Sequence, residues 1–173
     1  RANETSLNSP WDVSELDGLI YIAMAGAHQI WRYDPVKKTV DVFAGSGRED
    51  IADGLLKSAS LAQPSGISTG NGKLYFADSE TSSIRVIAGD TVKTLMGTGL
   101  FDFGWRDGRF PQALLQHPLG VAYDNGKVWI ADTYNNRIRL ADTIKGIIET
   151  VAGNTHDGIR DGAGNDALFD EPG

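Results

Sequence analysis

The chain has 173 residues, of which 40% are apolar, and its formal net charge is −7. This is enough apolar sequence to bury a sizeable core, and the acidity opposes nonspecific binding to nucleic acid or to an anionic membrane surface. Without cysteine, these residues cannot supply thiol catalysis, disulfides or cysteine-ligated zinc. No apolar run approaches the roughly 20 residues of a membrane helix, and no signal-peptide pattern is present. We expect a soluble chain, with the cytoplasm favoured as its compartment.

Internal repetition is the strongest pattern in the sequence. Proline recurs every 54 residues, at Pro10, Pro64, Pro118 and Pro172. Further columns align in the same register: Gly18, Gly72 and Gly126; Tyr21, Tyr75 and Trp129; Ala23, Ala77 and Ala131; Ile30, Ile84 and Ile138. Such self-similarity indicates one supersecondary unit repeated along the chain.

Each repeat predicts four short strands, because apolar runs alternate with Asn-Gly, Asp-Gly and Asp-Thr turn sequences. The first repeat, 10–63, predicts strands at 11–14, 19–23, 29–33 and 39–43. The second, 64–117, predicts them at 65–68, 73–77, 84–88 and 92–96. The third, 118–171, predicts them at 119–123, 128–131, 138–141 and 147–151. Residues 1–9 are interpreted as a connector from a preceding unit, and residues 172–173 as the start of a following one.

Two strings carry a family resemblance: PSGISTGNGKLYFADSETSSIR at 64–85 and PLGVAYDNGKVWIADTYNNRIR at 118–139. Both resemble NHL repeats, which combine an early proline and glycine with an Ala-Asp turn and a final Ile-Arg. LAQPSGIS at 61–68 and LLQHPLGV at 114–121 resemble the propeller of thioredoxin-like NHL proteins. The resemblance covers essentially the whole chain. It implies an all-β NHL β-propeller with three four-stranded blades, half of a six-bladed ring, and a thioredoxin-like domain upstream in the intact protein.

Several residues have the appearance of catalytic or metal-binding groups. Asp78 and Asp132 close a predicted strand, but their repetition favours acceptors that hold the following turn. The carboxylate-rich tail at 157–166 lacks the alternating ligand spacing of a calcium loop. His28, His117 and His156 occupy different places in the repeat, so ring symmetry does not gather them. We therefore predict no catalytic residue, no metal site and no cofactor.

Two departures from the repeat are the candidate partner-binding positions. Trp11 and Asp12 replace the pairs Ser65-Gly66 and Leu119-Gly120, so they either shape a ligand-binding mouth or repack a diverged blade. Phe101, Phe103 and Trp105 crowd one long connector, where they either anchor a partner or fold over an adjacent blade. His28, at a position where the family often has histidine, completes the candidates, although a structural or surface role is favoured for it.

The expected function is a noncatalytic platform for protein binding or scaffolding, within a larger thioredoxin-like NHL protein with a redox-related role. The expected partner is a protein, and neither nucleic acid nor membrane. The alternative is a propeller enzyme, a calcium-dependent lactonase or a metal-dependent lyase. Such an enzyme needs several inward-pointing ligands, and the innermost strands offer Asp12 alone. Apolar strand positions at both ends predict a segment excised from a larger ring, or a homodimer that completes six blades.

Overall fold

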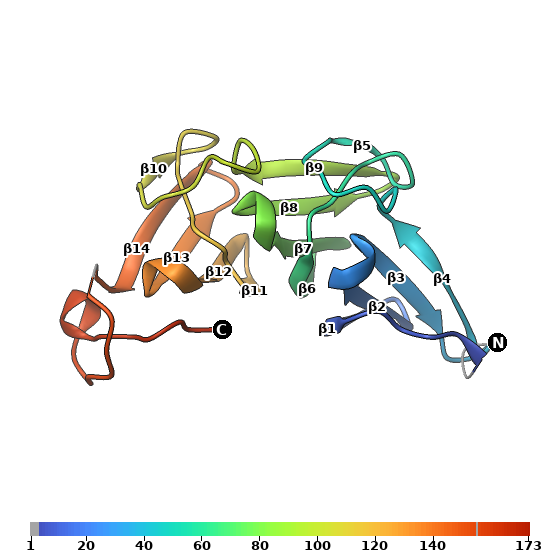
Figure 1. The fold of residues 1–173 in the computed structure, drawn as a ribbon, viewed down its shortest axis with the longest axis horizontal. Coiled ribbons are helices and arrows are strands. Elements are labelled where there is room, and N and C mark those ends of the chain that lie inside the picture. The colour runs from blue at the N-terminus through green and yellow to red at the C-terminus, as the bar shows by residue number, and fades with distance from the viewer. Residues whose placement is uncertain (1–3, 155) are drawn as a thin grey trace.

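The computed structural model describes residues 4–154 and 156–173, which form three antiparallel sheets set along an arc (Figure 1). The first sheet contains β1 (Pro10–Leu16), β2 (Leu19–Met24), β3 (Gln29–Asp34) and β4 (Thr39–Ala44). The second contains β6 (Pro64–Gly70), β7 (Lys73–Asp78), β8 (Ser83–Ala88) and β9 (Thr91–Met96). The third contains β11 (Gly120–Asp124), β12 (Lys127–Asp132), β13 (Arg137–Asp142) and β14 (Ile147–Gly153). These strands confirm the predicted all-β class.

The prediction of four strands per sheet is right for the first sheet and wrong for the other two. The connector before each of those sheets adds a two-residue edge strand, β5 (Gly54–Leu55) beside β9 and β10 (Gly108–Arg109) beside β14. In the first connector, the Asp53 carboxylate accepts a hydrogen bond from Thr94 N at 2.9 Å. This bond holds the connector alongside the outer strand, so the Asp-Gly pair extends the sheet.

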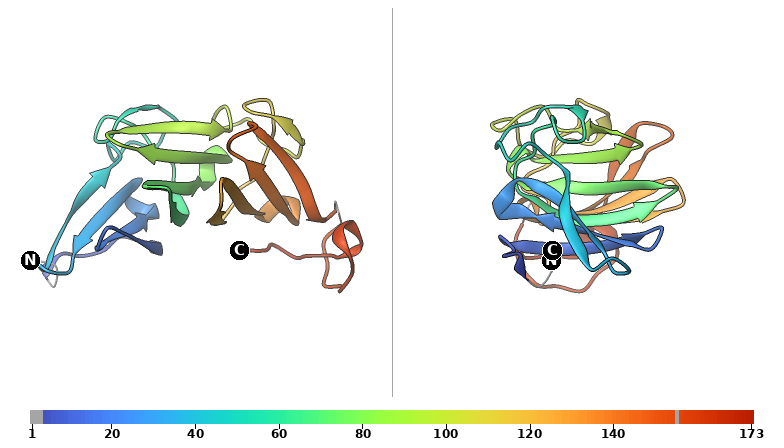
Figure 2. Two further views of the ribbon diagram at one scale, coloured as in Figure 1. Left: turned by 180° about the vertical axis from the view of Figure 1, so that it is seen from behind. Right: turned by 90° about the vertical axis from the view of Figure 1, so that its right-hand side faces the viewer.

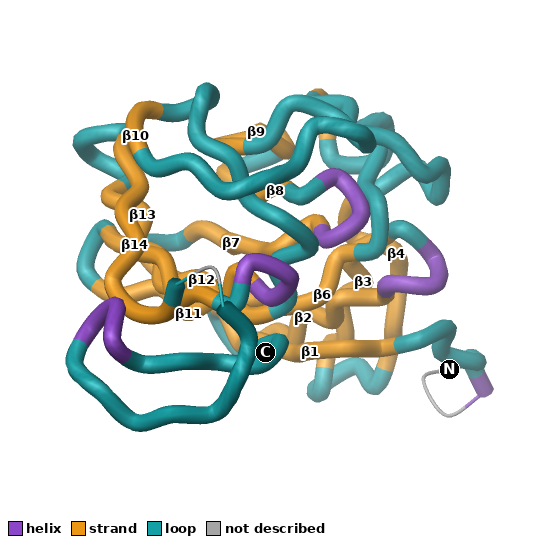
Figure 3. Tube along the Cα trace, turned by 60° about the vertical axis from the view of Figure 1, so that its left-hand side comes forward, coloured by secondary structure: helices purple, strands orange, loops and turns teal. Residues whose placement is uncertain are grey.

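The sheets share one orientation along the arc. β1, β6 and β11 lie on its concave side, and β4, β9 and β14 lie toward its outer side (Figures 1 and 2). Single 3-10 turns join the second strand of each sheet to the third: η2 (Ala25–Ala27), η3 (Ser79–Thr81) and η4 (Thr133–Asn135). A further turn, η5 (Gly164–Asp166), lies in the C-terminal tail (Figure 3).

Most of the buried apolar residues form two clusters, one at each junction between neighbouring sheets. The connector supplies an alanine and a leucine to each cluster, Ala59 and Leu61 at the first junction, Ala113 and Leu115 at the second. Repeat columns outside the predicted strands are therefore core positions. None of the helical turns in the described residues is long and apolar enough to cross a membrane.

A glycine sets the separation of the second and third sheets along the concave side. Gly66 N donates to the Leu119 carbonyl oxygen at 2.7 Å. A Cβ atom at Gly66 would lie only 2.4 Å from that oxygen, inside the closest contact that real side chains make. The glycine of the Pro-x-Gly sequence is thus required by the close approach of two strands.

Candidate functional site

The carboxylates that look catalytic in the sequence are parts of two buried ion pairs. Asp78 Oδ2 accepts from Arg85 Nη1 at 2.8 Å, and Asp132 Oδ2 accepts from Arg139 Nη1. All four side chains are fully buried. Burial raises the pKa of Asp78 to about 6 and raises that of Asp132, while the guanidinium beside each carboxylate acts in the opposite direction. The pairs lie inside the sheets and reach no solvent, which suits a structural role.

Both aspartates are acceptors, as predicted, but the predicted partner, the following turn, is found only for Asp132, which accepts from Asn135 Nδ2 at 2.9 Å; the arginine was missed in both. Each aspartate also accepts the backbone N–H of a connector residue, Ala62 for Asp78 and Gln116 for Asp132. A signal for the arginine was available, because it follows the aspartate by seven positions in both repeats. The intervening turn returns the chain antiparallel, which brings these two positions close together on neighbouring strands.

The structure assigns Asp12 a role between the first two sheets. Its carboxylate accepts from Val13 N at 2.8 Å and from Ile67 N at 2.9 Å. Asp12 occupies the repeat position of Gly66, where the next junction has direct backbone contact. At the first junction the Asp12 carboxylate therefore bridges two strands, whereas at the second junction the corresponding strands bond directly through their backbones. Trp11 beside it is half exposed and lines a groove of about 250 Å³ with Gly66, Leu119 and other residues.

His28 belongs to a recurring contact between sheets. It adopts a left-handed backbone conformation after η2, and its Nδ1 accepts from Gln63 N at 3.3 Å. Ser82 and Asn136 occupy the same repeat position and likewise accept a backbone N–H 35 residues further on. This bond requires an unprotonated Nδ1. The structure therefore gives His28 a bonded position at a sheet junction, away from the aromatic connector.

The aromatic connector, residues 100–105, presents its rings to solvent to different degrees. Phe101 is 89% exposed, Phe103 is 56% exposed and Trp105 is 54% exposed. The Trp105 ring covers the Arg137 guanidinium at 3.9 Å, a cation–π contact. Arg137 is buried, and its Nε and Nη1 have no hydrogen-bond partner among the described residues. Trp105 is thus anchored on one face, while Phe101 is free to contact another molecule.

A hollow of about 210 Å³ lies beside this connector. We call it the aromatic hollow; its lining includes Leu100, Phe103, His117 and Tyr134. The His117 and Tyr134 rings stack with centroids 4.5 Å apart and planes 13° apart. Glu80 Oε1 approaches His117 Nδ1 at 3.9 Å. The arrangement offers flat apolar rings with one carboxylate at the edge, a surface that suits an apolar or aromatic side chain with a nearby cation.

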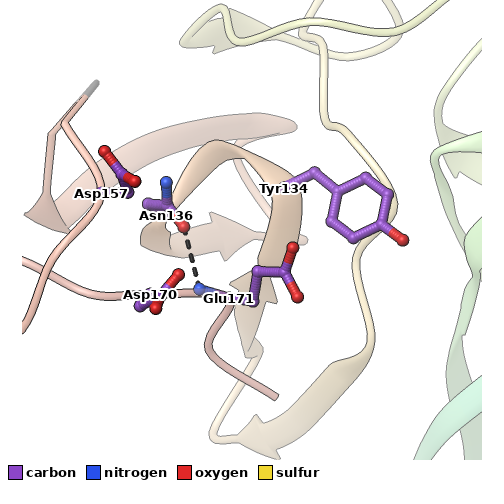
Figure 4. Close-up of a pocket in the computed structure, with 5 residues that line it drawn as sticks. All are labelled: Tyr134, Asn136, Asp157, Asp170 and Glu171. Atoms are coloured by element: carbon purple, nitrogen blue, oxygen red, sulfur yellow. Dashed lines mark hydrogen bonds between the residues drawn. The ribbon is translucent and has the colours of Figure 1, made fainter.

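A second hollow, of about 310 Å³, lies one repeat further along (Figure 4). We call it the acidic hollow, because it is lined by Tyr134, Asn136, Asp157, Asp170 and Glu171. All five of these residues sit 54 positions after residues of the aromatic hollow: Tyr134 after Glu80, Asn136 after Ser82, Asp157 after Phe103, Asp170 after Gln116, and Glu171 after His117. The same backbone geometry therefore supports an aromatic surface at one junction and a carboxylate-rich surface at the next.

The predicted positions do not converge on one site. Trp11 and Asp12 lie on the innermost strand of the first sheet, His28 at the first junction, and the aromatic connector at the second. In the part of the chain that the structure describes, no group of three or more His, Cys, Asp or Glu side chains could hold a metal ion. His117 and Tyr134 were missed as site residues, because only the fold brings their rings together.

Comparison with known proteins places these features in a family context. Residues 115–139 match the family model described as NHL repeat. The chain is 41% identical to Protein SUPPRESSOR OF QUENCHING 1, chloroplastic, of Arabidopsis thaliana, over 96% of the chain and 17% of that protein. It is 35% identical to NHL repeat-containing protein 2 of Bos taurus, over all of the chain and 28% of that protein. The chain thus spans less than a third of the length of these relatives.

The fold has a counterpart among solved structures. A Bacteroides thetaiotaomicron protein of unknown function superimposes with a TM-score of 0.72 at 22% identity. The match covers 90% of the present chain and 38% of that protein. At this identity the likeness shows a shared fold alone. The sequence matches, and not this one, carry the family assignment.

Proposed function

Because this chain is an NHL-repeat chain, as its resemblance predicted, we propose that its three sheets are three blades of a β-propeller that binds a protein partner. The 54-residue repeat supports the first half of this proposal, since each repeat supplies the four main strands of one sheet. Six such blades would close a ring, of which these residues form half. The relatives that share the sequence are several times longer, so we place the segment within a larger protein.

The two ends of the arc support a continuing ring. Tyr75 of the second sheet is 4% exposed, whereas Trp129, at the same position of the third sheet, is 40% exposed. At the other end, Val13 is exposed, whereas Ile67 at the same repeat position is buried. Apolar side chains that neighbouring sheets cover inside the arc are thus bare at both ends. Such faces suit further blades, because each blade of a propeller packs against two neighbours.

The observation that carries the binding role is the exposed aromatic connector beside the aromatic hollow. Interface anchors are typically large aromatic side chains near a pocket that accepts a partner group. Phe103 lines the hollow together with the stacked rings of His117 and Tyr134, and Phe101, two positions earlier on the same connector, is exposed to solvent. A protein partner with an apolar or aromatic side chain beside a basic one fits this combination, because Glu80 lies at the edge of the rings.

We propose that these residues act without catalysis and that any redox chemistry of the whole protein lies outside them, since they contain no cysteine. The enzyme alternative needs several ligands on the concave side, and Asp12 there is engaged by two backbone N–H groups. Addition of calcium or zinc provides the test. A metal-dependent enzyme predicts a raised melting temperature with one of these ions, whereas the binding platform predicts no change.

The binding role is tested by replacing Phe101, Phe103 and Trp105 with serine in the full chain. A matched control replaces Val36, Ile144 and Ile159, which are exposed apolar residues on other loops. Both variants should keep the wild-type circular dichroism spectrum. In quantitative affinity capture from cell extract, a set of proteins should bind the wild type and the control but be lost with the aromatic variant. Equal capture by all three proteins, or unfolding of the aromatic variant alone, would overturn the proposal.

A further inference from the structure

The buried arginines of the second and third sheets are each held by the connector that precedes their sheet. Arg85 donates to the carbonyl oxygens of Ser60 and Ala52 at 3.2 Å each, and to the Asp53 carboxylate at 3.2 Å. Arg139 donates to the carbonyl oxygens of Leu114 and Arg106 at 3.2 Å each, and to the Asp107 carboxylate at 2.8 Å. The two sets lie 54 residues apart throughout. Each connector is thus a receptor with three acceptors for one guanidinium group.

The C-terminal tail repeats the conformation of these connectors. In the second connector, Arg106 and Leu114 form an antiparallel bridge, and Gly104 N donates to the Leu115 oxygen. In the tail, Arg160 and Leu168 form the same bridge, and Gly158 N donates to the Phe169 oxygen.

Side-chain bonds repeat as well. The Arg106 guanidinium donates to the backbone carbonyl oxygen of Gln112, and the Arg160 guanidinium donates to that of Asp166, again 54 residues later. Two connectors that share backbone and side-chain bonds present their acceptors in the same arrangement.

The tail therefore places three acceptors in the receptor geometry: the Arg160 carbonyl, the Asp161 carboxylate and the Leu168 carbonyl. Asp161 is exposed, and its carboxylate has no hydrogen-bond or ion-pair partner among the described residues. Asp170 N occupies the repeat position of Ala62 N and Gln116 N, which donate to the buried aspartates. We propose that residues 157–170 form a binding site for an arginine side chain, supplied together with a paired aspartate by a further sheet docked against the third.

The chemistry of the acceptors selects the ligand. A planar guanidinium reaches two carbonyls and one carboxylate at once, whereas an ammonium group lacks the fork that such an arrangement needs. The first sheet of a second copy of this chain does not fit, because it carries Met24 and Trp31 where the other sheets carry aspartate and arginine. The site therefore favours another NHL-type sheet, with aspartate and arginine seven positions apart, over closure onto a second copy of this chain.

The test is a titration of the isotopically labelled chain with N-acetyl-arginine methylamide, followed by amide chemical shifts. Shifts should concentrate in residues 157–170, and N-acetyl-lysine methylamide should bind at least tenfold more weakly. Asp161→Asn should weaken arginine binding at least tenfold. The matched control Asp157→Asn, a carboxylate of the same segment that is not one of the three acceptors, should leave the affinity unchanged. Absence of arginine-induced shifts in the tail, equal binding of the lysine compound, or equal loss in both variants would overturn the proposal.

A second arm tests the docked sheet. Appending another copy of residues 120–173 after Gly173 places an arginine 54 positions after Arg139. In this extended chain, Asp161→Asn should lower the melting temperature, and in the original chain it should not. An equal effect in both chains would contradict the docking. The inference rests on the proposed function only for the source of the arginine, and neither arm involves the aromatic connector, so failure of partner capture and failure of this site remain distinguishable.

Discussion

The first sheet and the two that follow it satisfy the same backbone group in different ways. Ala62 N and Gln116 N each donate to a buried carboxylate, whereas Asn8 N, at the equivalent position, donates to the Met24 sulfur at 3.3 Å. A thioether is a weak acceptor. In the same sheet Trp31 replaces the arginine and donates to Gln29 instead. The strands form in all three sheets, so the ion pair is not needed to build a sheet; it holds the preceding connector in place.

The largest expected effect comes from breaking one pair. Arg139→Met removes the donor to Asp132, Asp107 and two carbonyls and leaves a buried carboxylate without its counter-ion. The free energy of unfolding should fall by about 3–5 kcal/mol, measured by urea denaturation. The control Arg32→Met removes the half-exposed pair with Asp41 in the first sheet and should cost about 1 kcal/mol or less. Similar losses in the two variants would show that burial of the pair is unimportant.

The next largest effect is on the pH dependence of stability, because the second sheet has a buried carboxylate, Asp78, where the first sheet has Met24. The folded-state pKa of Asp78 is about 6, above the value of 3.8 for a free aspartate. The folded protein therefore holds more protons than the unfolded chain between about pH 4 and pH 6, so the free energy of unfolding should fall as the pH rises through this window. Over this whole window, deprotonation of Asp78 should lower the free energy of unfolding by about 3 kcal/mol. Urea titrations should show a shallower slope in Asp78→Asn; parallel slopes would refute the assignment.

The comparison is sharpened by giving the second sheet the two residues that the first sheet has at these repeat positions, methionine and tryptophan. In Asp78→Met with Arg85→Trp, the two replacements should be less harmful together than the sum of the single variants. The single variants each leave a buried charge unpaired, and the double variant leaves none, so we expect a coupling free energy of about 2 kcal/mol. A double-mutant cycle in urea measures it. Strict additivity would mean that the two positions do not interact.

The smallest expected effect concerns the junction of the first two sheets. Asp12→Ala removes the carboxylate that accepts from Ile67 N, which should cost about 1 kcal/mol. Glu149→Ala, at an exposed strand position of the third sheet, serves as the control and should change stability by less than about 0.5 kcal/mol. Hydrogen exchange of the Ile67 amide should also accelerate in the Asp12 variant only. An unchanged exchange rate would show that the carboxylate does not protect this amide.

The repeat made the strands predictable, because each column is constrained by three examples at once. Gly18, Gly72 and Gly126 marked the hairpin turns, and the apolar columns marked the buried strand faces. The edge strands β5 and β10 were missed, because two residues paired with a distant Val92 or Ile148 carry no local pattern. Among the candidate site residues, the exposure of the aromatic connector was one of two alternatives that the sequence left open. Its neighbours His117 and Tyr134 depend on a contact between segments that only folding creates.

The bonds between a connector and the arginine of the following sheet also determine where this chain divides into transferable modules. A cut at Pro64 or Pro118 follows the sequence repeat, but it separates Asp53 from Arg85, or Asp107 from Arg139. A cut directly after β4 or β9 keeps each arginine with the connector that binds it. For anyone assembling repeat arrays from this protein, the unit to copy is a sheet together with the connector before it, and the proline lies inside that unit.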